Sequence, residues 1–190
     1  MRTFTILLVL IFIYFPFSAS ESIVLNDKHG DVFNSYLYQG LNQYKHILSY
    51  RESSNNPKAI GRNYYKGLYS IGKSTAKDIG VCYDSLFIPS YSDESLVKLM
   101  RYNDRLLKSC RYIDKKGNTR ITLDYYLYVN KTIKGIKVTK AGLLAGCHLK
   151  GHIWVKIWLK SNGEIDAKDA NGVKVSSYIK MMENVELIKF

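Results

Sequence analysis

The sequence has few cysteines, and their number and spacing limit what they can do. Cys82, Cys110 and Cys147 are the three cysteines in 190 residues. An odd number cannot pair completely within one chain, and none of the three has another cysteine at the short spacing of a zinc or redox motif. One disulfide with a free thiol and three reduced thiols both fit this pattern, so the disulfide state stays open.

Long apolar runs are equally scarce, because only the N-terminal segment contains one. Arg2 precedes an apolar run of fourteen residues from Phe4 to Phe17, and small residues follow it. A membrane-spanning helix needs about twenty residues, whereas a charged start, an apolar middle and a small-residue end are typical of a secretory signal peptide. The sequence thus predicts a signal peptide over residues 1–20, one domain over residues 21–190 without a stable membrane anchor, and a periplasmic or secreted location.

Acidic side chains are outnumbered by basic ones. Sixteen Asp and Glu residues stand against 28 Lys and Arg residues, which gives a net charge of +12. An exported cationic protein is suited to anionic partners such as cell walls, phospholipids and acidic glycans, and its export excludes nucleic acid from the expected partners. A coding bias toward AT-rich codons explains part of the same composition.

Apolar residues at helical spacing dominate the rest of the chain. The side chains of Asp31, Ser74, Ser92 and Thr139 can each accept a free backbone N–H group, so they are predicted N-caps. Residues 63–71 are aromatic and interrupted by glycine, which fits a small β-ribbon or an extended loop. The predicted fold class is therefore mainly α (α+β), a single domain with helices over residues 31–50, 74–80, 92–114, 124–131, 140–150, 152–160 and 176–183.

The most polar loop follows the first predicted helix. The stretch YRESSNNPKAIGRNYYKGLYSIG runs from Tyr50 to Gly72 and has one glutamate, Glu52, near its start. It resembles the catalytic segment of the lysozyme-like peptidoglycan hydrolases, the lytic transglycosylase and goose-type lysozyme group. In that group a helix ends in Glu-Ser, an Asn-Pro loop follows, and a Gly-Leu-x-Gln run comes next. The matching pairs here are Glu52-Ser53, Asn56-Pro57 and Gly67-Leu68.

Two later segments carry the same resemblance. TKAGLLAGCHLKGHIWVKIWL is similar to the later helix pair of the group, above all in its phage-type and secreted members. Those members also end in a segment similar to Asp169-Ala170-Asn171-Gly172 followed by Tyr178-Ile179. Three segments in the same order make the resemblance more specific than a lone Glu-Ser pair.

The resemblance implies a lysozyme-like fold and cleavage of peptidoglycan between N-acetylmuramic acid and N-acetylglucosamine. It implies Glu52 as the general acid and base, because cleavage of a glycosidic bond needs a proton on the leaving oxygen. A carboxyl group half-covered by aromatic rings keeps its proton more readily, and Tyr50, Tyr64, Tyr65 and Tyr69 are candidates for this cover. The implied substrate-binding residues are Ser53, Gly67, Leu68, Tyr69, Ser70 and His148.

The number of carboxylates bears on the type of cleavage. A retaining or inverting hydrolase needs a second carboxylate near the first, whereas a lytic transglycosylase uses an N-acetyl group or a hydroxyl of its substrate as nucleophile. The acids that follow Glu52, Asp78 and Asp84, are far along the chain, although folding can bring another acid close. The sequence therefore favours the transglycosylase reaction over the muramidase reaction.

Two departures from the group keep other functions open. Ser70 stands where the group has glutamine, and the glycine-rich turn after His148 is reduced to Gly151. An impaired relative could bind glycan or assemble with a secretion apparatus, and a toxin-like effector would need an immunity partner. Glu52 could also be a surface charge at a helix end, and Ser53 a plain turn residue.

No metal or other cofactor is expected. His148 and His152 are four residues apart, which can place two ligands on one helix face. Gly151 breaks the predicted helix between them, and no acidic third ligand is near. His148 is therefore predicted to lie in the groove wall or the core. The loop DAKDANG lacks the acidic spacing and the distant glutamate of a calcium loop, so it is predicted to be a turn.

Overall fold

The computed structural model describes residues 32–108, 111–113, 116, 118–121 and 123–187. The chain divides into two units, Met1–Val32 and Phe33–Phe190, and the description below concerns the second. The predicted signal peptide, its boundary and the predicted cap Asp31 lie outside the described residues and stay predictions. In the described part, no helix combines the length and the apolar character needed to cross a bilayer.

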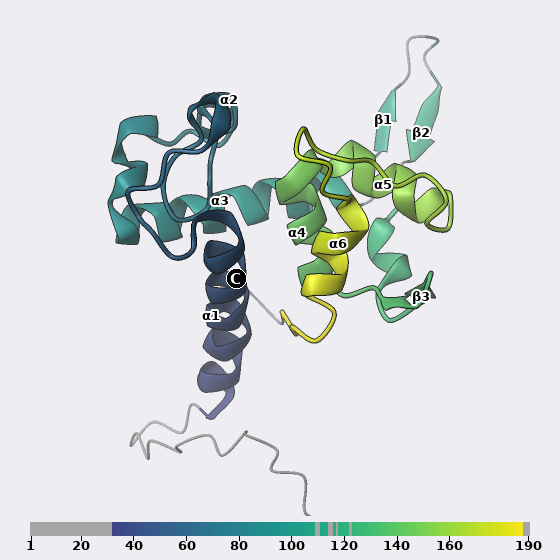
Figure 1. The fold of residues 1–190 in the computed structure, drawn as a ribbon. Coiled ribbons are helices and arrows are strands. Elements are labelled where there is room, and N and C mark those ends of the chain that lie inside the picture. The colour runs from purple at the N-terminus through teal and green to yellow at the C-terminus, as the bar shows by residue number, and fades with distance from the viewer. Residues whose placement is uncertain (1–31, 109–110, 114–115, 117, 122, 188–190) are drawn as a thin grey trace, which may run out of the picture. The chain divides into compact units, whose positions relative to one another are not determined.

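Helices account for most of the regular structure, as Figure 1 shows, and the mainly α prediction is confirmed. The α-helices are α1 (Val32–Ser53), α2 (Lys73–Asp78), α3 (Pro89–Leu107), α4 (Lys140–Lys150), α5 (His152–Lys160) and α6 (Val175–Met181). The 3₁₀-helices are η1 (Arg62–Tyr64), η2 (Tyr83–Phe87) and η3 (Tyr125–Tyr128). Two antiparallel hairpins pair β1 (Arg111–Ile113) with β2 (Thr119–Ile121) and β3 (Thr132–Ile133) with β4 (Ile136–Lys137).

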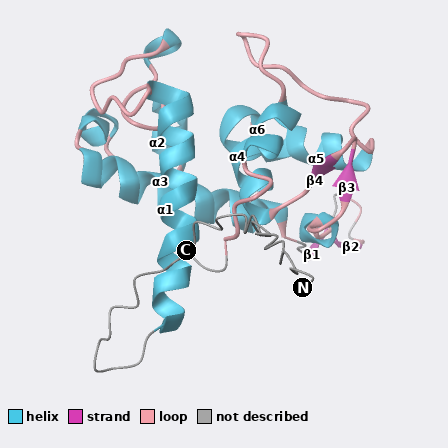
Figure 2. Cartoon of the chain, turned by 60° about the horizontal axis from the view of Figure 1, so that its bottom comes forward, coloured by secondary structure: helices cyan, strands magenta, loops and turns pink. Residues whose placement is uncertain are grey.

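The core forms where α4 packs against α5 and α6, which lie beside it in Figure 2. Residues 141–147 of α4 are all buried. A Cβ atom at Gly142 would lie 2.8 Å from the Ile179 carbonyl oxygen, and one at Gly146 would lie 3.0 Å from a methyl carbon of Val155. The first contact is closer than real side chains show, and the second is tighter than most, so the glycines of α4 are what let α6 and α5 lie close to it.

The helix α1 carries Glu52 on its buried face. Tyr44 and Leu48 are fully buried, and Glu52 follows at the same spacing of four residues, so all three lie along one side of the helix. The helix ends because Ser54 and Asn55 have positive φ angles of 53° and 60°. The N–H group of Asn55 then donates to the carbonyl oxygen of Ser49 at 3.2 Å, which closes the last turn.

The predicted ribbon after α1 consists of isolated antiparallel bridges rather than continuous strands. Lys66 pairs with Ile60 on one side and with Ile71 on the other. The adjacent Gly67 has a φ angle of +76°, and a Cβ atom there would collide with the carbonyl group of Leu86 in η2. Glycine at this position lets the ribbon lie directly on η2.

The predicted starts of α2 and α3 are wrong. Gly72, not Ser74, occupies the N-cap position of α2. Because glycine has no side chain, no side-chain hydrogen bond caps this helix. Pro89 begins α3 three residues before the predicted cap Ser92. Ser92 is instead a buried residue within the first turns of this helix. Proline suits the first helical turn because its fixed φ angle is already helical and its missing N–H group is not needed there.

The region after α3 contains less helix than the spacing predicts. The predicted helix over 92–114 ends at Leu107, and a hairpin replaces its last part. The predicted helix over 124–131 is only the 3₁₀-helix η3, although Asp124 does cap it by accepting the N–H group of Tyr126 at 2.9 Å. The hairpin of β3 and β4 has no counterpart in the prediction.

The predictions around α4 are confirmed. The Thr139 hydroxyl accepts the N–H group of Gly142 at 2.9 Å, as an N-cap does. Gly151, with a φ angle of +83°, separates α4 from α5. The helix α6 spans 175–181 where 176–183 was predicted.

Candidate functional site

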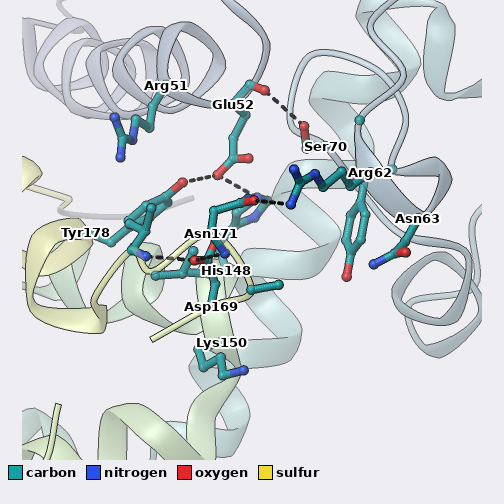
Figure 3. A pocket seen from close by; sticks show the side chains of 15 residues that line it. Arg51, Glu52, Arg62, Asn63, Ser70, His148, Lys150, Asp169, Asn171 and Tyr178 are labelled. Carbon is teal, nitrogen blue, oxygen red and sulfur yellow. Dashed lines mark hydrogen bonds and ion pairs between the residues drawn. The ribbon is translucent and has the colours of Figure 1, made fainter. Parts of the chain in front are cut away.

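A cavity of about 470 Å³ lies beside the end of α1. Its walls come from the ends of α1 and α4, the segment around η1, the ribbon at Ser70, the loop before α6, and α6 itself (Figure 3). The volume is in the range of small-molecule and cofactor sites, about 300–1,000 Å³. Segments that are far apart in the sequence therefore meet around one space that can hold a sugar-sized ligand.

Glu52 reaches this cavity with one of its two carboxylate oxygens already in use. Its side chain is 14% exposed, and its Oε1 accepts the hydroxyl proton of Tyr178 at 2.5 Å. Nε2 of His148 lies 3.6 Å from the same oxygen. Among the described residues no donor contacts Oε2. The Tyr178 hydrogen bond thus fixes the carboxylate, and Oε2 is left for a ligand.

Tyr178 remains a hydrogen-bond donor over a wide pH range. Burial and the neighbouring Glu52 carboxylate raise the pKa of Tyr178 well above its ordinary value, and Arg51 partly opposes this rise. The guanidinium carbon of Arg51 lies 5.9 Å from the centre of the Tyr178 ring. A phenol that keeps its proton can hold the Glu52 carboxylate at neutral and mildly alkaline pH alike.

Two other predicted site residues line the cavity with Glu52. His148, in the last turn of α4, has a side chain that is 6% exposed, and its buried Nδ1 has no hydrogen-bond partner in the described part of the chain. The Ser70 hydroxyl donates to the backbone carbonyl of Glu52 at 3.1 Å. Ser70 therefore ties the ribbon to the end of α1.

The remaining predicted substrate-binding residues do not line the cavity. The Ser53 hydroxyl contacts the carbonyl oxygens of Ser49 at 3.0 Å and Leu68 at 2.9 Å, which joins α1 to the ribbon. Tyr69 is buried, and its hydroxyl donates to Asp93 at 2.6 Å. Together with Gly67, these residues hold the segment from Tyr50 to Gly72 in shape and do not line the cavity.

The expected aromatic cover over Glu52 comes from a different tyrosine. Tyr50 and Tyr64 are 66% and 76% exposed, and Tyr69 points to Asp93, so none of these three covers the carboxyl group. Only Tyr65 of the expected group lines the cavity. Tyr178 takes their place because its hydroxyl reaches the Glu52 carboxylate from α6. Its segment formed part of the family resemblance, but no spacing in the sequence links it to Glu52.

A second carboxylate, that of Asp169, lines the same cavity, whereas Asp78 and Asp84, the acids that follow Glu52 in the sequence, do not. Oδ1 of Asp169 accepts the N–H groups of Asn171 and Val173, each at 2.8 Å, and so forms the turn before α6. Oδ2 has no hydrogen-bond partner among the described residues. The sequence predicted a turn at this point, and the turn is what brings the carboxylate to the cavity wall.

Three basic side chains also line the cavity: Arg51, Arg62 and Lys150. One nitrogen of the Arg62 guanidinium donates to the amide oxygen of Asn171 at 3.3 Å, a contact visible in Figure 3. The cavity therefore combines two carboxylates with three cations. Such a mixture suits a polar ligand that carries acidic groups, because the cations attract it and the carboxylates remain free for proton transfer.

The described part of the chain has no group of three or more metal-ligating side chains. His152 does not line the cavity with His148. Cys82 is exposed and Cys147 is buried, and both are free thiols, while Cys110 lies outside the described residues. Burial raises the pKa of the Cys147 thiol above its ordinary value, which leaves it unreactive.

The site has the groups that acid–base cleavage of a glycosidic bond requires. A carboxyl group with a fixed orientation, a second carboxylate and a cavity of suitable size occur together. Comparison with protein-family models, with curated proteins and with solved structures finds no match to this chain. The functional argument therefore rests on the residues of the site and on their arrangement.

Proposed function

We propose that the chain is an exported enzyme of lysozyme-like fold that cleaves peptidoglycan strands between N-acetylmuramic acid and N-acetylglucosamine. The observation that carries the proposal is the environment of Glu52, the glutamate of the Glu-Ser motif. Its Oε1 is held by Tyr178 and lies next to His148, and its Oε2 is free within a cavity. A fixed carboxyl group with one free oxygen is the arrangement that a general acid needs.

In the proposed reaction Glu52 gives its proton to the glycosidic oxygen as the bond from C1 to that oxygen breaks. The electron pair of the bond stays on the oxygen, which leaves as a hydroxyl group. C1 then bonds either to a hydroxyl of the same sugar, which gives its proton back to the Glu52 carboxylate, as in a lytic transglycosylase, or to water, as in a muramidase. Asp169 is the candidate base for the proton that water releases in the second case.

Digestion of purified peptidoglycan tests the proposed function. We expect soluble muropeptides, and mass spectrometry of the products separates the two reactions because the transglycosylase product is an anhydro-sugar and the muramidase product has a reducing end. Binding of the strands without cleavage would overturn the proposal that the chain is an enzyme. That outcome would favour the alternative, a glycan-binding relative without activity. In such a relative Ser70, whose hydroxyl binds the Glu52 backbone carbonyl, would have a structural role only.

Replacing Tyr178 by phenylalanine should lower kcat about ten- to a hundredfold and leave KM within a fewfold. The change removes the hydrogen bond to Oε1 of Glu52, and a hydrogen bond to a charged group is worth about 1.5–3 kcal/mol. The carboxyl group then loses its fixed orientation without any loss of sugar contacts. Steady-state kinetics on soluble peptidoglycan fragments measures both constants.

Tyr126→Phe is the matched control for this variant. It removes a similar phenol–carboxylate hydrogen bond, 2.8 Å long, to Asp104, and it does not line the cavity. We expect a lower unfolding midpoint in this control but an unchanged kcat. An equal loss of kcat in both variants would mean that Tyr178 acts through stability alone.

Replacing Asp169 by asparagine should lower the yield of the reducing-end product about a hundredfold, because a general base contributes about 10²–10⁴ to the rate. Asparagine keeps the Oδ1 acceptor for Asn171 and Val173, so the turn survives. The change removes only the proton acceptor at Oδ2. Product analysis by mass spectrometry, before and after the substitution, measures the effect.

Asp166→Asn is the control for Asp169, since Asp166 is three residues away and does not line the cavity. Both of its carboxylate oxygens already bind the backbone and hydroxyl of Ser176. This control should leave the product ratio unchanged. If the native chain releases mainly anhydro-sugars and Asp169→Asn does not alter their rate, Asp169 has no role as a base.

A further inference from the structure

Some basic residues of the chain have an acidic partner, but the three cations of the cavity have none among the described residues. Lys45 pairs with Asp93 at 2.9 Å and Lys66 with Asp84 at 2.6 Å. Among the described residues, Arg51, Arg62 and Lys150 form no ion pair with Glu52, with Asp169 or with any other acidic side chain. Their charges are therefore left for a ligand.

These three side chains come from three separate segments and meet only in the fold. Arg51 is at the end of α1, Arg62 is in η1 and Lys150 is in the last turn of α4. The contact of Arg62 with Asn171 uses one of its N–H groups and leaves the others free. A guanidinium group binds a carboxylate through two parallel hydrogen bonds, and an ammonium group adds a point charge.

We propose that Arg62 and Lys150, supported by Arg51, form a subsite for a carboxylate carried by the substrate. The inference rests on the proposed function in taking a glycan strand as the ligand, and it specifies which strands the chain prefers. Strands whose sugars carry acidic substituents bind, and uncharged strands of the same length bind weakly. In peptidoglycan the acidic group is either the lactyl carboxylate of muramic acid or a carboxylate of the peptide attached to it.

The position of the subsite fits this class of substrate. The cations line the same cavity as Glu52 and Tyr178, so the acidic substituent sits on a sugar close to the bond that is cleaved. Tyr65, also in the cavity wall and 43% exposed, offers an aromatic face for the sugar ring itself. A neutral strand would use the ring contact but leave the cations without partners.

The test measures binding separately from cleavage. The full chain with Glu52→Gln is titrated by calorimetry with three probes: chitotetraose, an oligomer of N-acetylglucosamine and N-acetylmuramic acid with free lactyl carboxylates, and the same oligomer with its peptides. We expect at least one acidic probe to bind about tenfold more tightly than chitotetraose. The probe at which the gain first occurs identifies the lactyl or the peptide carboxylate as the group recognised.

Adding Arg62→Gln and Lys150→Gln should reduce the tenfold preference to about twofold or less. The control pair is Lys98→Gln with Arg101→Gln, two exposed residues of α3 outside the cavity that remove the same charge. The control should keep the preference. Equal binding of neutral and acidic probes, no binding of the acidic probes, or an equal loss in the control pair would each overturn the subsite.

The outcomes also separate the subsite from the proposed function. Selective binding of an acidic probe, together with no cleavage of peptidoglycan by the native chain, would refute the proposed enzymatic activity but support the proposed carboxylate subsite. Cleavage of peptidoglycan without any preference for the acidic probes would retain the enzyme and refute the subsite.

Discussion

Glycan cleavage should fall by about a hundred- to ten-thousandfold when Glu52 is replaced by glutamine. Glutamine has nearly the same shape and keeps an oxygen that can accept the Tyr178 hydrogen bond, but it has no acidic proton to give. General acid catalysis is typically worth that range in rate. The loss should appear in kcat, because the sugar contacts of the cavity remain.

The measurement is the release of soluble products from purified peptidoglycan, with the far-ultraviolet circular dichroism and the unfolding midpoint recorded for each variant. Glu94→Gln is the matched control, since Glu94 is exposed on α3 and outside the cavity. This control should keep the native rate. Cleavage by the Glu52 variant at a rate within a fewfold of the native chain would show that another residue supplies the proton.

Replacing Gly67 by alanine should lower the free energy of unfolding by about 3 kcal/mol or more. A left-handed backbone with a side chain costs about 1–2 kcal/mol, and an extra carbon in a packed site adds about 1–3 kcal/mol. Both costs apply here, because φ is +76° and the added carbon would collide with the Leu86 carbonyl group. Backbone cannot rotate away as a side chain can, so the ribbon would have to move off η2.

Gly135→Ala separates the two costs. Gly135 has a φ angle of +75°, but nothing lies within 4 Å of its added carbon, so only the backbone term of about 1–2 kcal/mol should remain. Urea denaturation of both variants gives the two free energies of unfolding. Equal losses would mean that the contact of Gly67 with η2 contributes nothing to stability.

Local signals in the sequence predicted the parts of the fold that depend on a few neighbouring residues. The Thr139 cap and the break at Gly151 are of this kind, and both occur as predicted. The β3–β4 hairpin was missed because its turn has Lys134 at a φ angle of 49° before Gly135. Such a turn is usually marked by asparagine or aspartate before glycine, and lysine gives no such signal.

The candidate site was predicted less completely than the helices. Glu52, Ser70 and His148 could be named because they belong to recognisable segments, and the structure brings them together. Tyr178 and Asp169 could not be placed beside Glu52, because only tertiary packing joins them. Tyr50 and Tyr64 lie near Glu52 in the sequence and were expected to cover it, but both are exposed to solvent, and Tyr69 instead binds Asp93.

The close packing of α6 on α4 makes the geometry of the cavity depend on residues that do not line it. Tyr178 reaches Glu52 from α6, and α6 lies where it does because Gly142 and Gly146 have no side chains. A helix pushed outward there by even part of an ångström would carry the phenol away from its acceptor. Under the proposed function, a substitution at either glycine that still lets the chain fold would lower the rate of cleavage, so residues of the core would be constrained by the reaction as well as by folding.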